Sequence, residues 1–423
     1  MDLKPYPKYK DSGISWVGEI PKGWEVHRLK FLLFTLESGG REEGGGSMLD
    51  KGIFSLGGEH INWNGTLNLD NPKLVSEEYY KKMKQGKLKN NDVLLLKDGA
   101  TIGKTAILRK KEFKKMAVNE HVFLMRANKR IDPKLLYYLI CSDYGFKQIK
   151  LTEVGSAQGG INQDFISKIY FIVPADKHEQ TAIANFLDKK IAQIDVLIEK
   201  DKKLIELLKE RRTALINHAV TKGLDPNAKL KDSGIPWIGE IPEGWEIGRL
   251  KNKTLIKYGA SLSELERIEG NISVFGSNGE VGKHNKSITQ GKTLIIGRKG
   301  SYGKLNLSEN SCFPIDTTYF IDNTCTKCDI KYLYYLLSQL ELDEISRDSA
   351  VPGLSREVVY NKVIPYVLKP EQTAIANYLD KATVRIDQTI QKVEQKINLL
   401  EEYKKSLIHN VVTGKIDVRE VKP

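Results

Sequence analysis

The sequence is poor in cysteine and contains no long apolar run. Four cysteines among 423 residues are too few for a disulfide framework, and the first residues, MDLKPYPKYKDSG, lack the apolar core of a secretion signal. Apolar runs such as residues 93–96 and 135–140 are far shorter than the roughly 20 residues that a membrane-spanning helix needs. These absences predict a cytoplasmic protein without a membrane partner.

Recognisable enzyme motifs are also missing. Residues 99–105 read GATIGKT, with three residues between the glycines where a phosphate-binding loop has four, and residues 300–304 read GSYGK. The sequence has no glycine-rich dinucleotide fingerprint and no Asn-Pro-Pro-aromatic tetrad of base methylation. We therefore expect no catalytic residue and no cofactor in this chain. A lysine on such a turn can still contact DNA phosphates; a plain hairpin turn is the alternative.

Two cysteines have the spacing of zinc ligands. Cys325 and Cys328 are separated by two residues, but a four-ligand site needs two more ligands. The same body offers only Cys312 and His284, and His284 is remote in the sequence. A reduced pair of thiols before a helix is the simpler interpretation. We predict no metal site.

What the chain does contain is a duplication. Residues 11–30 read DSGISWVGEIPKGWEVHRLK, and residues 232–251 read DSGIPWIGEIPEGWEIGRLK. A second phrase, EQTAIANFLD at residues 179–188, returns as EQTAIANYLD at residues 371–380. The offsets are 221 and 192, so the body between the two phrases is 29 residues shorter in the second copy. A repeated frame around two different bodies is typical of a protein that needs two related but different binding surfaces.

The charge balance favours a polyanionic partner. Lys and Arg number 66 against 54 Asp and Glu, and the pI is about 9.1. The tails, residues 179–222 and 371–415, hold nine basic against seven acidic residues and seven against six. We call the repeated segments at residues 11–30 and 232–251 the heads. Most of the positive excess therefore lies in the heads and in the bodies that follow them, where we expect any contact with nucleic acid.

Both tails show a heptad pattern. Apolar residues recur at alternating steps of four and three, which indicates two long coiled-coil helices, each about 40 residues or roughly 60 Å long. Each helix needs a partner along its stripe, and the other tail, packed antiparallel, is the nearest candidate. The predicted pairing seam consists of Leu187, Ile191, Ile194, Ile198, Ile205, Leu208, Leu215, Leu379, Ile386, Ile390, Val393, Ile397, Leu400 and Leu407.

The bodies, about residues 31–175 and 252–369, predict two small α/β domains. Short β-rich runs alternate with Gly and Asn turns, and each body has one helical stretch. The turns display groups that read base edges and grip phosphates, although ordinary turn chemistry is an alternative for each of them. The predicted DNA-binding residues are His60, Lys97, Lys104, Gln158, Asn162, Ser277, Asn278, His284, Arg298, Lys299, Ser301, Tyr302, Lys304 and Arg356.

Taken together, the phrase DSGIxWxGEIPxGWE heading each half, the GxxGK-like turns and the EQxxIAxxLD phrases resemble the DNA-specificity subunit of Type I restriction-modification systems. The resemblance covers essentially the whole chain. It implies two α/β target-recognition domains joined by two long antiparallel coiled-coil helices, with an internal pseudo-two-fold duplication. The corresponding ranges are 1–175 and 223–369 for the domains, 176–222 and 370–415 for the spacer helices, and 416–423 for a C-terminal tail.

The same resemblance implies a function. The chain would be the non-catalytic subunit that binds a bipartite, asymmetric site in double-stranded DNA and directs two methyltransferase subunits and the restriction and translocase subunits to it. S-adenosylmethionine, ATP and Mg²⁺ are implied for those partners. A structural coiled-coil adaptor with two protein-binding end domains is the alternative, and it predicts no salt-sensitive binding to duplex DNA.

Overall fold

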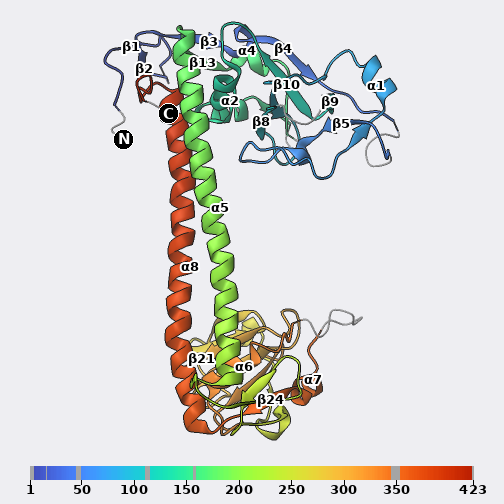
Figure 1. Ribbon diagram of the computed structural model, residues 1–423, viewed down its shortest axis with the longest axis vertical. Helices are drawn as coiled ribbons and strands as arrows, with labels where there is room; N and C mark the ends of the chain where they lie inside the picture. Colours follow the sequence, from blue (N-terminus) through green and yellow to red (C-terminus); the bar gives the residue numbers. More distant parts are fainter. Residues whose placement is uncertain are drawn as a thin grey trace. The chain divides into compact units, whose positions relative to one another are not determined.

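The chain folds into two units, each of which takes residues from both repeated tails. The computed structural model describes residues 4–15, 17–43, 49–109, 115–155, 159–343 and 353–421. Unit 1 comprises Met1–Lys200 and Lys396–Pro423, and unit 2 comprises Asp201–Gln395. Figure 1 shows α-helices and β-strands in both units, in agreement with the predicted α/β class.

A four-stranded antiparallel sheet forms the centre of unit 1. Its strands, in spatial order, are β4 (Leu33–Ser38), β10 (Val122–Ala127), β7 (Val93–Leu96) and β8 (Thr105–Ile107). All four residues of β7 are buried. Leu94 and Leu96 join the core beneath the second sheet, while Phe123 stacks on Phe165 of α4 (Phe165–Lys168) with 5.6 Å between ring centroids. Because both faces are covered, β7 is a continuous apolar run in the sequence.

The second sheet of unit 1 has three strands, β6 (Leu74–Val75), β5 (Ile53–Leu56) and β9 (Met116–Val118), and β5 pairs with β9 in parallel. Asp132 caps the helix α2 (Pro133–Cys141) by accepting from the amides of Lys134 and Leu135. The remaining elements of unit 1 before the long helices are β1 (Tyr9–Asp11), β2 (Glu19–Pro21), β3 (Trp24–Arg28), η1 (Leu29–Phe31), η2 (Gly58–His60), α1 (Glu77–Lys82), α3 (Asp143–Lys150), β11 (Glu153–Val154), β12 (Gly160–Ile161) and β13 (Tyr170–Pro174).

Unit 2 repeats this plan. Its four-stranded sheet has the order β17 (Lys257–Tyr258), β23 (Thr318–Asp322), β20 (Thr293–Gly297) and β21 (Leu305–Ser308). Its three-stranded sheet has the order β19 (Gly279–His284), β18 (Ile272–Gly276) and β22 (Phe313–Pro314), again with one parallel pair. The remaining elements are β14 (Leu230–Asp232), β15 (Glu240–Pro242), β16 (Glu246–Arg249), η3 (Leu250–Asn252), η4 (Glu264–Glu266), α6 (Ile330–Leu337), α7 (Arg356–Asn361) and β24 (Val363–Tyr366).

The two bodies differ most in one segment. Arg28 pairs with the strand β13 as Arg249 pairs with β24, and the offset between them is 221. The carbonyls of Lys97 and Arg298 accept from equivalent amides, those of Ile161 and Leu354, and their offset is only 201. Twenty of the 29 missing residues therefore fall between the head and this turn, in the segment that supplies two strands of the three-stranded sheet, β5 and β6 in unit 1 and β18 and β19 in unit 2.

Two long helices, α5 (Lys177–Lys222) and α8 (Lys369–Val412), carry the heptad pattern. Within unit 1, Lys404 Nζ lies 2.6 Å from Asp195 Oδ1, and within unit 2, Arg212 Nε lies 2.9 Å from Asp387 Oδ1. The residue numbers of both pairs add to 599, as antiparallel helices in one register require. Every residue of the predicted seam is buried or half-buried. The helix pairs thus bury their apolar stripes against each other, and the predicted fold of α/β domains with long antiparallel helices is confirmed.

In both units, side chains from the first repeated phrase contact side chains from the second. In unit 1 the indole Nε1 of Trp24 donates to Glu179 Oε1 at 2.9 Å, and in unit 2 that of Trp245 donates to Glu371 at 3.2 Å. Each glutamate opens a long helix and each tryptophan belongs to a head. The recurring phrases are therefore the parts that attach a helix to its body.

The next residue of the phrase is a buried glutamine with the same role in both units. Gln180 donates to the carbonyl of Pro174 at 2.7 Å and accepts from the amide of Asp132 at 2.8 Å. Gln372 accepts from the amide of Asp329 at 2.8 Å and donates to the carbonyl of Val367. The first turn of each long helix is thus fixed to the cap of the short helix in its body.

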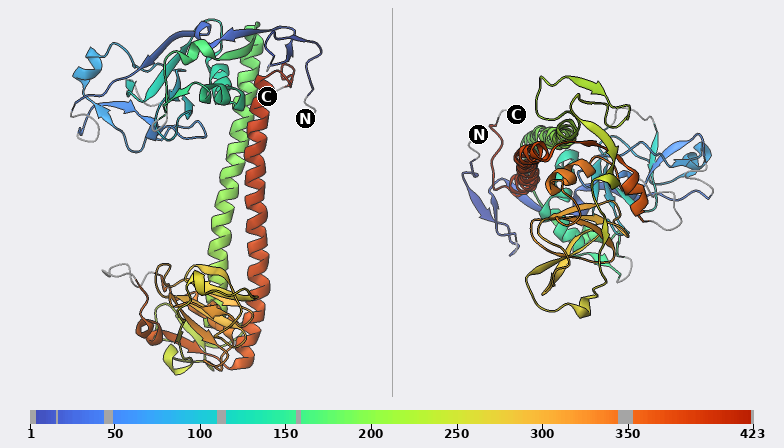
Figure 2. Two further views of the ribbon diagram at one scale, coloured as in Figure 1. Left: turned by 180° about the vertical axis from the view of Figure 1, so that it is seen from behind. Right: turned by 90° about the horizontal axis from the view of Figure 1, so that it is seen from below.

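The two ends of the chain lie side by side in unit 1 (Figures 1 and 2). Lys4 forms an antiparallel bridge with Asp417, and Tyr9 donates its hydroxyl to the carbonyl of Gly414 at 3.0 Å. Gly414 has a φ of +70° just after α8, and Gly223 has a φ of +76° just after α5. In unit 2 the chain runs directly from the end of α5 into the head. In unit 1 the corresponding junction is made by two separate segments, the residues after α8 and the N-terminal residues that precede the head.

We predict that Trp24→Phe destabilises unit 1 by about 1–3 kcal/mol, because the buried Glu179 carboxylate loses a hydrogen-bond donor. Hydrogen exchange of the amides in residues 177–190 measures this loss. The control is Trp63→Phe, the same change at an exposed indole of unit 1, which should stay within about 0.5 kcal/mol of the wild type. Equal protection in both variants would show that the indole donor does not stabilise this attachment.

Candidate nucleic-acid interface

In unit 2 most of the predicted DNA-binding residues come together at the turn between β20 and β21. This turn, residues 298–304, is tight because Gly300 and Gly303 have φ values of +72° and +77°. Lys299, Ser301 and Lys304 are exposed on it, and Tyr302 packs partly against the core. The glycine-rich turn connects two antiparallel strands, whereas a phosphate-binding loop leads from a strand into a helix. The turn therefore displays cations without forming a nucleotide site.

A second turn meets the first. Between β18 and β19, Asn278 accepts from Lys304 Nζ through its side-chain oxygen at 2.6 Å and through its carbonyl at 3.1 Å. A Cβ placed on Gly300 would lie 3.5 Å from Ser277 Oγ. The structure thus brings Ser277, Asn278 and the 298–304 turn into one surface.

Arg298 and Arg356 lie on the same surface, together with a tyrosine that the sequence analysis missed. Their Cζ atoms are 5.0 Å and 4.7 Å from the ring centroid of Tyr258. Lys299 forms a bridge with Gly353, which places the start of α7 beside the turn. We call Tyr258, Ser277, Asn278, Arg298, Lys299, Ser301, Lys304 and Arg356 the turn cluster. Nothing in the sequence around Tyr258, LIKYGAS, indicated that it lies next to residues far along the chain.

Unit 1 carries different side chains at the equivalent turn. Lys97 replaces Arg298 and lies with its Nζ 5.0 Å from the ring centroid of Phe123. Asp98 replaces Lys299, and its Oδ1 lies at hydrogen-bond distance, 2.7 Å, from His121 Nδ1. His121, like Tyr258, was not predicted from the sequence. The same frame thus presents an acidic residue in unit 1 where unit 2 presents a basic one.

Two other predicted residues of unit 1 lie at or beside this turn. Lys104 is half-buried at its end, and Asn162 is exposed just after Ile161, whose amide donates to the carbonyl of Lys97. Gln158 lies outside the described residues.

The two predicted histidines are buried. His60 accepts from the amide of Gly57 at 2.8 Å through Nδ1 and donates to the carbonyl of Asn71 at 3.0 Å through Nε2. His284 accepts from the amide of Ile268 at 3.0 Å, and its ring packs edge-on against Phe313. Because both rings are engaged by the main chain and only 3% and 6% exposed, we assign His60 in η2 and His284 at the end of β19 to the frame of their units and not to the turn cluster.

The two cysteines with zinc-ligand spacing lie in or against the core of unit 2. Cys325 is buried in it and Cys328 packs against it, and burial raises the pKa of the Cys325 thiol. Within the described ranges, no group of three or more His, Cys, Asp or Glu side chains is arranged to hold a metal ion. The described helices likewise include none that is long and apolar enough to cross a bilayer.

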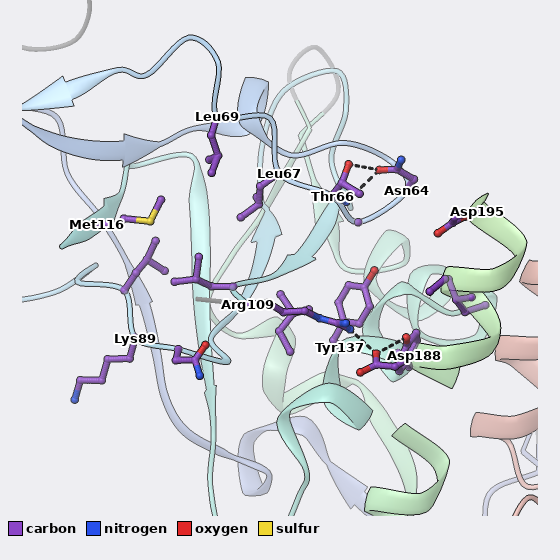
Figure 3. Close-up of a pocket in the computed structure, with 18 residues that line it drawn as sticks. Asn64, Thr66, Leu67, Leu69, Lys89, Arg109, Met116, Tyr137, Asp188 and Asp195 are labelled. Atoms are coloured by element: carbon purple, nitrogen blue, oxygen red, sulfur yellow. Dashed lines mark hydrogen bonds and ion pairs between the residues drawn. The ribbon is translucent and has the colours of Figure 1, made fainter. Parts of the chain in front are cut away.

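A cavity of about 470 Å³ lies in unit 1 between the body and α5 (Figure 3). Leu67, Leu69 and Met116 line it from the body, and Asp195 lines it from α5. None of the predicted DNA-binding residues lines it. The cavity therefore belongs to the attachment of the helix and not to the turn cluster.

Asp188 is the polar centre of that attachment. It accepts from Tyr138 at 2.7 Å, from Lys134 Nζ at 2.9 Å and from Arg109, which reaches across the cavity (Figure 3). Burial on its own would raise the pKa of Asp188, but the hydrogen bonds from Lys134 and Tyr138 and the charge of Arg109 lower that pKa below its usual range. In unit 2, Asp380 accepts from Tyr335 at 2.8 Å and from Lys331 at 2.6 Å. The aspartate that closes the repeated phrase therefore has the same role twice.

Comparison with known proteins gives a clear family. The family model described as the Type I restriction modification DNA specificity domain matches residues 21–208 and again residues 242–402. The chain belongs to this family. Two relatives from Methanocaldococcus jannaschii are the type I restriction enzyme MjaX specificity subunit, 25% identical over 95% of this chain and 96% of that protein, and the MjaVIII specificity subunit, 26% identical over 78% and 80%. The family of specificity subunits implied by the sequence motifs is therefore confirmed.

Solved structures share the fold. A chain from a structure of a type I R-M system covers 93% of this chain and 98% of its own, with a TM-score of 0.73 and 15% identity. The HsdS subunit from Thermoanaerobacter tengcongensis covers 94% and 98%, with a TM-score of 0.55 and 16% identity. These solved chains share the fold of this chain at only 15% and 16% sequence identity. Its DNA-contacting residues therefore have to be inferred from its own side chains.

We predict that Asp188→Asn lowers the free energy of unfolding by about 1.5–3 kcal/mol at pH 7. A carboxyl group whose pKa is lowered by folding stabilises the fold above its unfolded pKa, near 3.9, and loses this contribution as the pH falls toward the folded pKa. The difference between wild type and variant should therefore shrink below about pH 4. Urea unfolding between pH 3 and 7 measures it. Asp70→Asn, at an exposed aspartate of unit 1, is the control and should change little; a difference that does not vary with pH would contradict the assignment.

Proposed function

We propose that this specificity subunit recognises a bipartite, asymmetric site in duplex DNA, with one half-site read by each unit. The observation that carries the proposal is the difference between the two equivalent turns. Arg298, Lys299 and Lys304 form a basic surface in unit 2, while unit 1 has Lys97 and the pair of Asp98 with His121. A shared frame that presents different donors and acceptors suits two half-sites of different sequence.

We further propose that the chain supplies recognition and that its partners supply the chemistry. S-adenosylmethionine, ATP and Mg²⁺ would be bound by methyltransferase and restriction subunits. The relatives are named as subunits of type I restriction enzymes, and one solved structure concerns complex assembly in a type I R-M system. This supports a role in which the chain is one part of a larger complex.

The surfaces of the long helices support docking of a methyltransferase subunit. In unit 2, Leu204 and Leu207 of α5 are 41% and 49% exposed, and they are three residues apart on one face of the helix. In unit 1, Val196, Leu399 and Tyr403 are also exposed on the long helices. Exposed apolar residues that recur along a helix are typical of a contact with a partner. We assign this contact to one methyltransferase subunit per unit.

The recognition proposal is tested by co-expressing the chain with its methyltransferase partner and mapping methylated adenines by single-molecule sequencing. We expect one motif with two specified halves and an unspecified gap, and no methylation when the chain is omitted. The purified complex should also bind a duplex carrying this motif with an affinity that falls steeply with salt, by a log-log slope of about −0.9 per phosphate contact. A structural adaptor would give no motif and no salt-sensitive binding.

For the docking proposal, we predict that Leu204→Glu with Leu207→Glu weakens binding of one methyltransferase subunit by about 100-fold, because two apolar side chains worth about 1.5 kcal/mol or more each no longer lose water on binding. Native mass spectrometry of the co-purified complex should then show one methyltransferase subunit per chain. The control exchanges the charges of the exposed pair Lys203 and Glu206, which leaves the apolar surface intact and should retain two. Two subunits in both variants would place the docking surface elsewhere.

A further inference from the structure

Two arginines of unit 2 lie against one exposed tyrosine. The guanidinium carbons of Arg298 and Arg356 are 5.0 Å and 4.7 Å from the ring centroid of Tyr258, whose side chain is 47% exposed. The three residues come from the 298–304 turn, the first position of α7 and the strand β17. A guanidinium held against an aromatic ring by a cation–π contact has less freedom to move. Both side chains are therefore ordered before any ligand arrives.

The main chain fixes the same two groups further. Arg298 Nη1 donates to the carbonyl of Asp316 at 3.1 Å, and Arg356 Nη1 donates to the carbonyl of Ile256 at 3.3 Å. Among the residues that the structure describes, no carboxylate lies within ion-pair distance of either guanidinium. Each guanidinium has five N–H donors, so each keeps its charge and several donors for a ligand. Because the side chains are already ordered, binding costs less entropy.

A ligand that matches such a group has two adjacent acceptors in one plane. In the major groove of DNA only guanine offers this pair, its O6 and N7 atoms, and arginine is its usual partner. The neighbouring cations suit the phosphates: Lys299 is exposed, and Lys304 is held by Asn278. The turn cluster thus contains two arginines whose guanidiniums are already ordered, and two lysines whose ammonium groups act as point charges.

We propose that Arg298 and Arg356 read guanines in the half-site of unit 2, each through paired hydrogen bonds to O6 and N7, with Tyr258 holding both guanidiniums. The proposal rests on the proposed function and adds the base that is read. Unit 1 has Lys97 and Gln163 at the equivalent positions, since Gln163 follows Gly160 as Arg356 follows Gly353. Glutamine suits adenine, so unit 1 does not carry the same pair of forks.

The experiment uses the complete chain in complex with its methyltransferase partner and duplexes carrying the mapped motif. Each guanine of the motif is replaced in turn by 7-deazaguanine, which lacks the N7 acceptor but still pairs with cytosine. We expect affinity to fall about 5- to 100-fold at two positions of one half-site. In Arg298→Gln the sensitivity should vanish at one of these positions, and in Arg356→Gln at the other. The 7-deazaguanine series on the unaltered complex needs no variant, so a variant that fails to fold does not prevent the test.

Lys299→Gln is the matched control, because it removes one positive charge from an exposed side chain of the same turn. It should weaken binding about equally for all duplexes, reduce the salt slope by about 1 and leave the 7-deazaguanine sensitivity unchanged. If the arginine variants behave in this way too, they contact phosphates and the proposal is overturned while the proposed function stands. The proposal is also overturned, and the proposed function stands, if no guanine of the mapped motif has a 7-deazaguanine effect that depends on Arg298 or Arg356. A complex that methylates no bipartite motif removes the proposed function itself.

Discussion

The structure depends on the attachment of each long helix to its body through a few buried or half-buried polar groups in the first turns of the helix. Glu179 and Glu371 accept from the two tryptophans of the heads, Gln180 and Gln372 engage the main chain, and the aspartates nine residues after each glutamate accept from a tyrosine and a lysine. Such groups cost free energy when one partner is lost, so the whole set is needed together. This requirement explains why both phrases recur almost unchanged.

The same reasoning explains where the two halves differ. A residue on the exposed side of a turn has no buried partner to satisfy, so Lys299 and Asp98 can occupy equivalent positions without disturbing the sheet beneath. Longer changes fall between the head and the turn, where the first body has twenty more residues than the second. The two halves thus share the residues that attach the long helices and differ in the exposed turn residues that a ligand would contact.

The sequence predicted the frame well and the turn cluster only partly. Helices α5 and α8 could be predicted because their periodicity is long and their ends carry Gly223 and Gly414, which the structure places in the left-handed region. The turn cluster was partly predictable, because turn residues with cationic side chains are local features. Tyr258 was not, since its contacts with Arg298 and Arg356 depend on how distant strands are ordered in the sheet.

For His60 and His284, residue type predicted a DNA contact that burial argues against. His60 and His284 have side chains that suit a nucleic-acid contact, and both lie in the segment where the two bodies diverge. In each case a ring nitrogen accepts from a main-chain amide, and the ring packs edge-on against a phenylalanine, Phe54 in one unit and Phe313 in the other. Two bodies that share little sequence in this segment therefore use the same residue type to satisfy a buried amide. The segment between the head and the turn therefore contains part of the shared frame, a histidine that bonds the main chain and packs on a phenylalanine, even though its length and sequence differ between the two bodies.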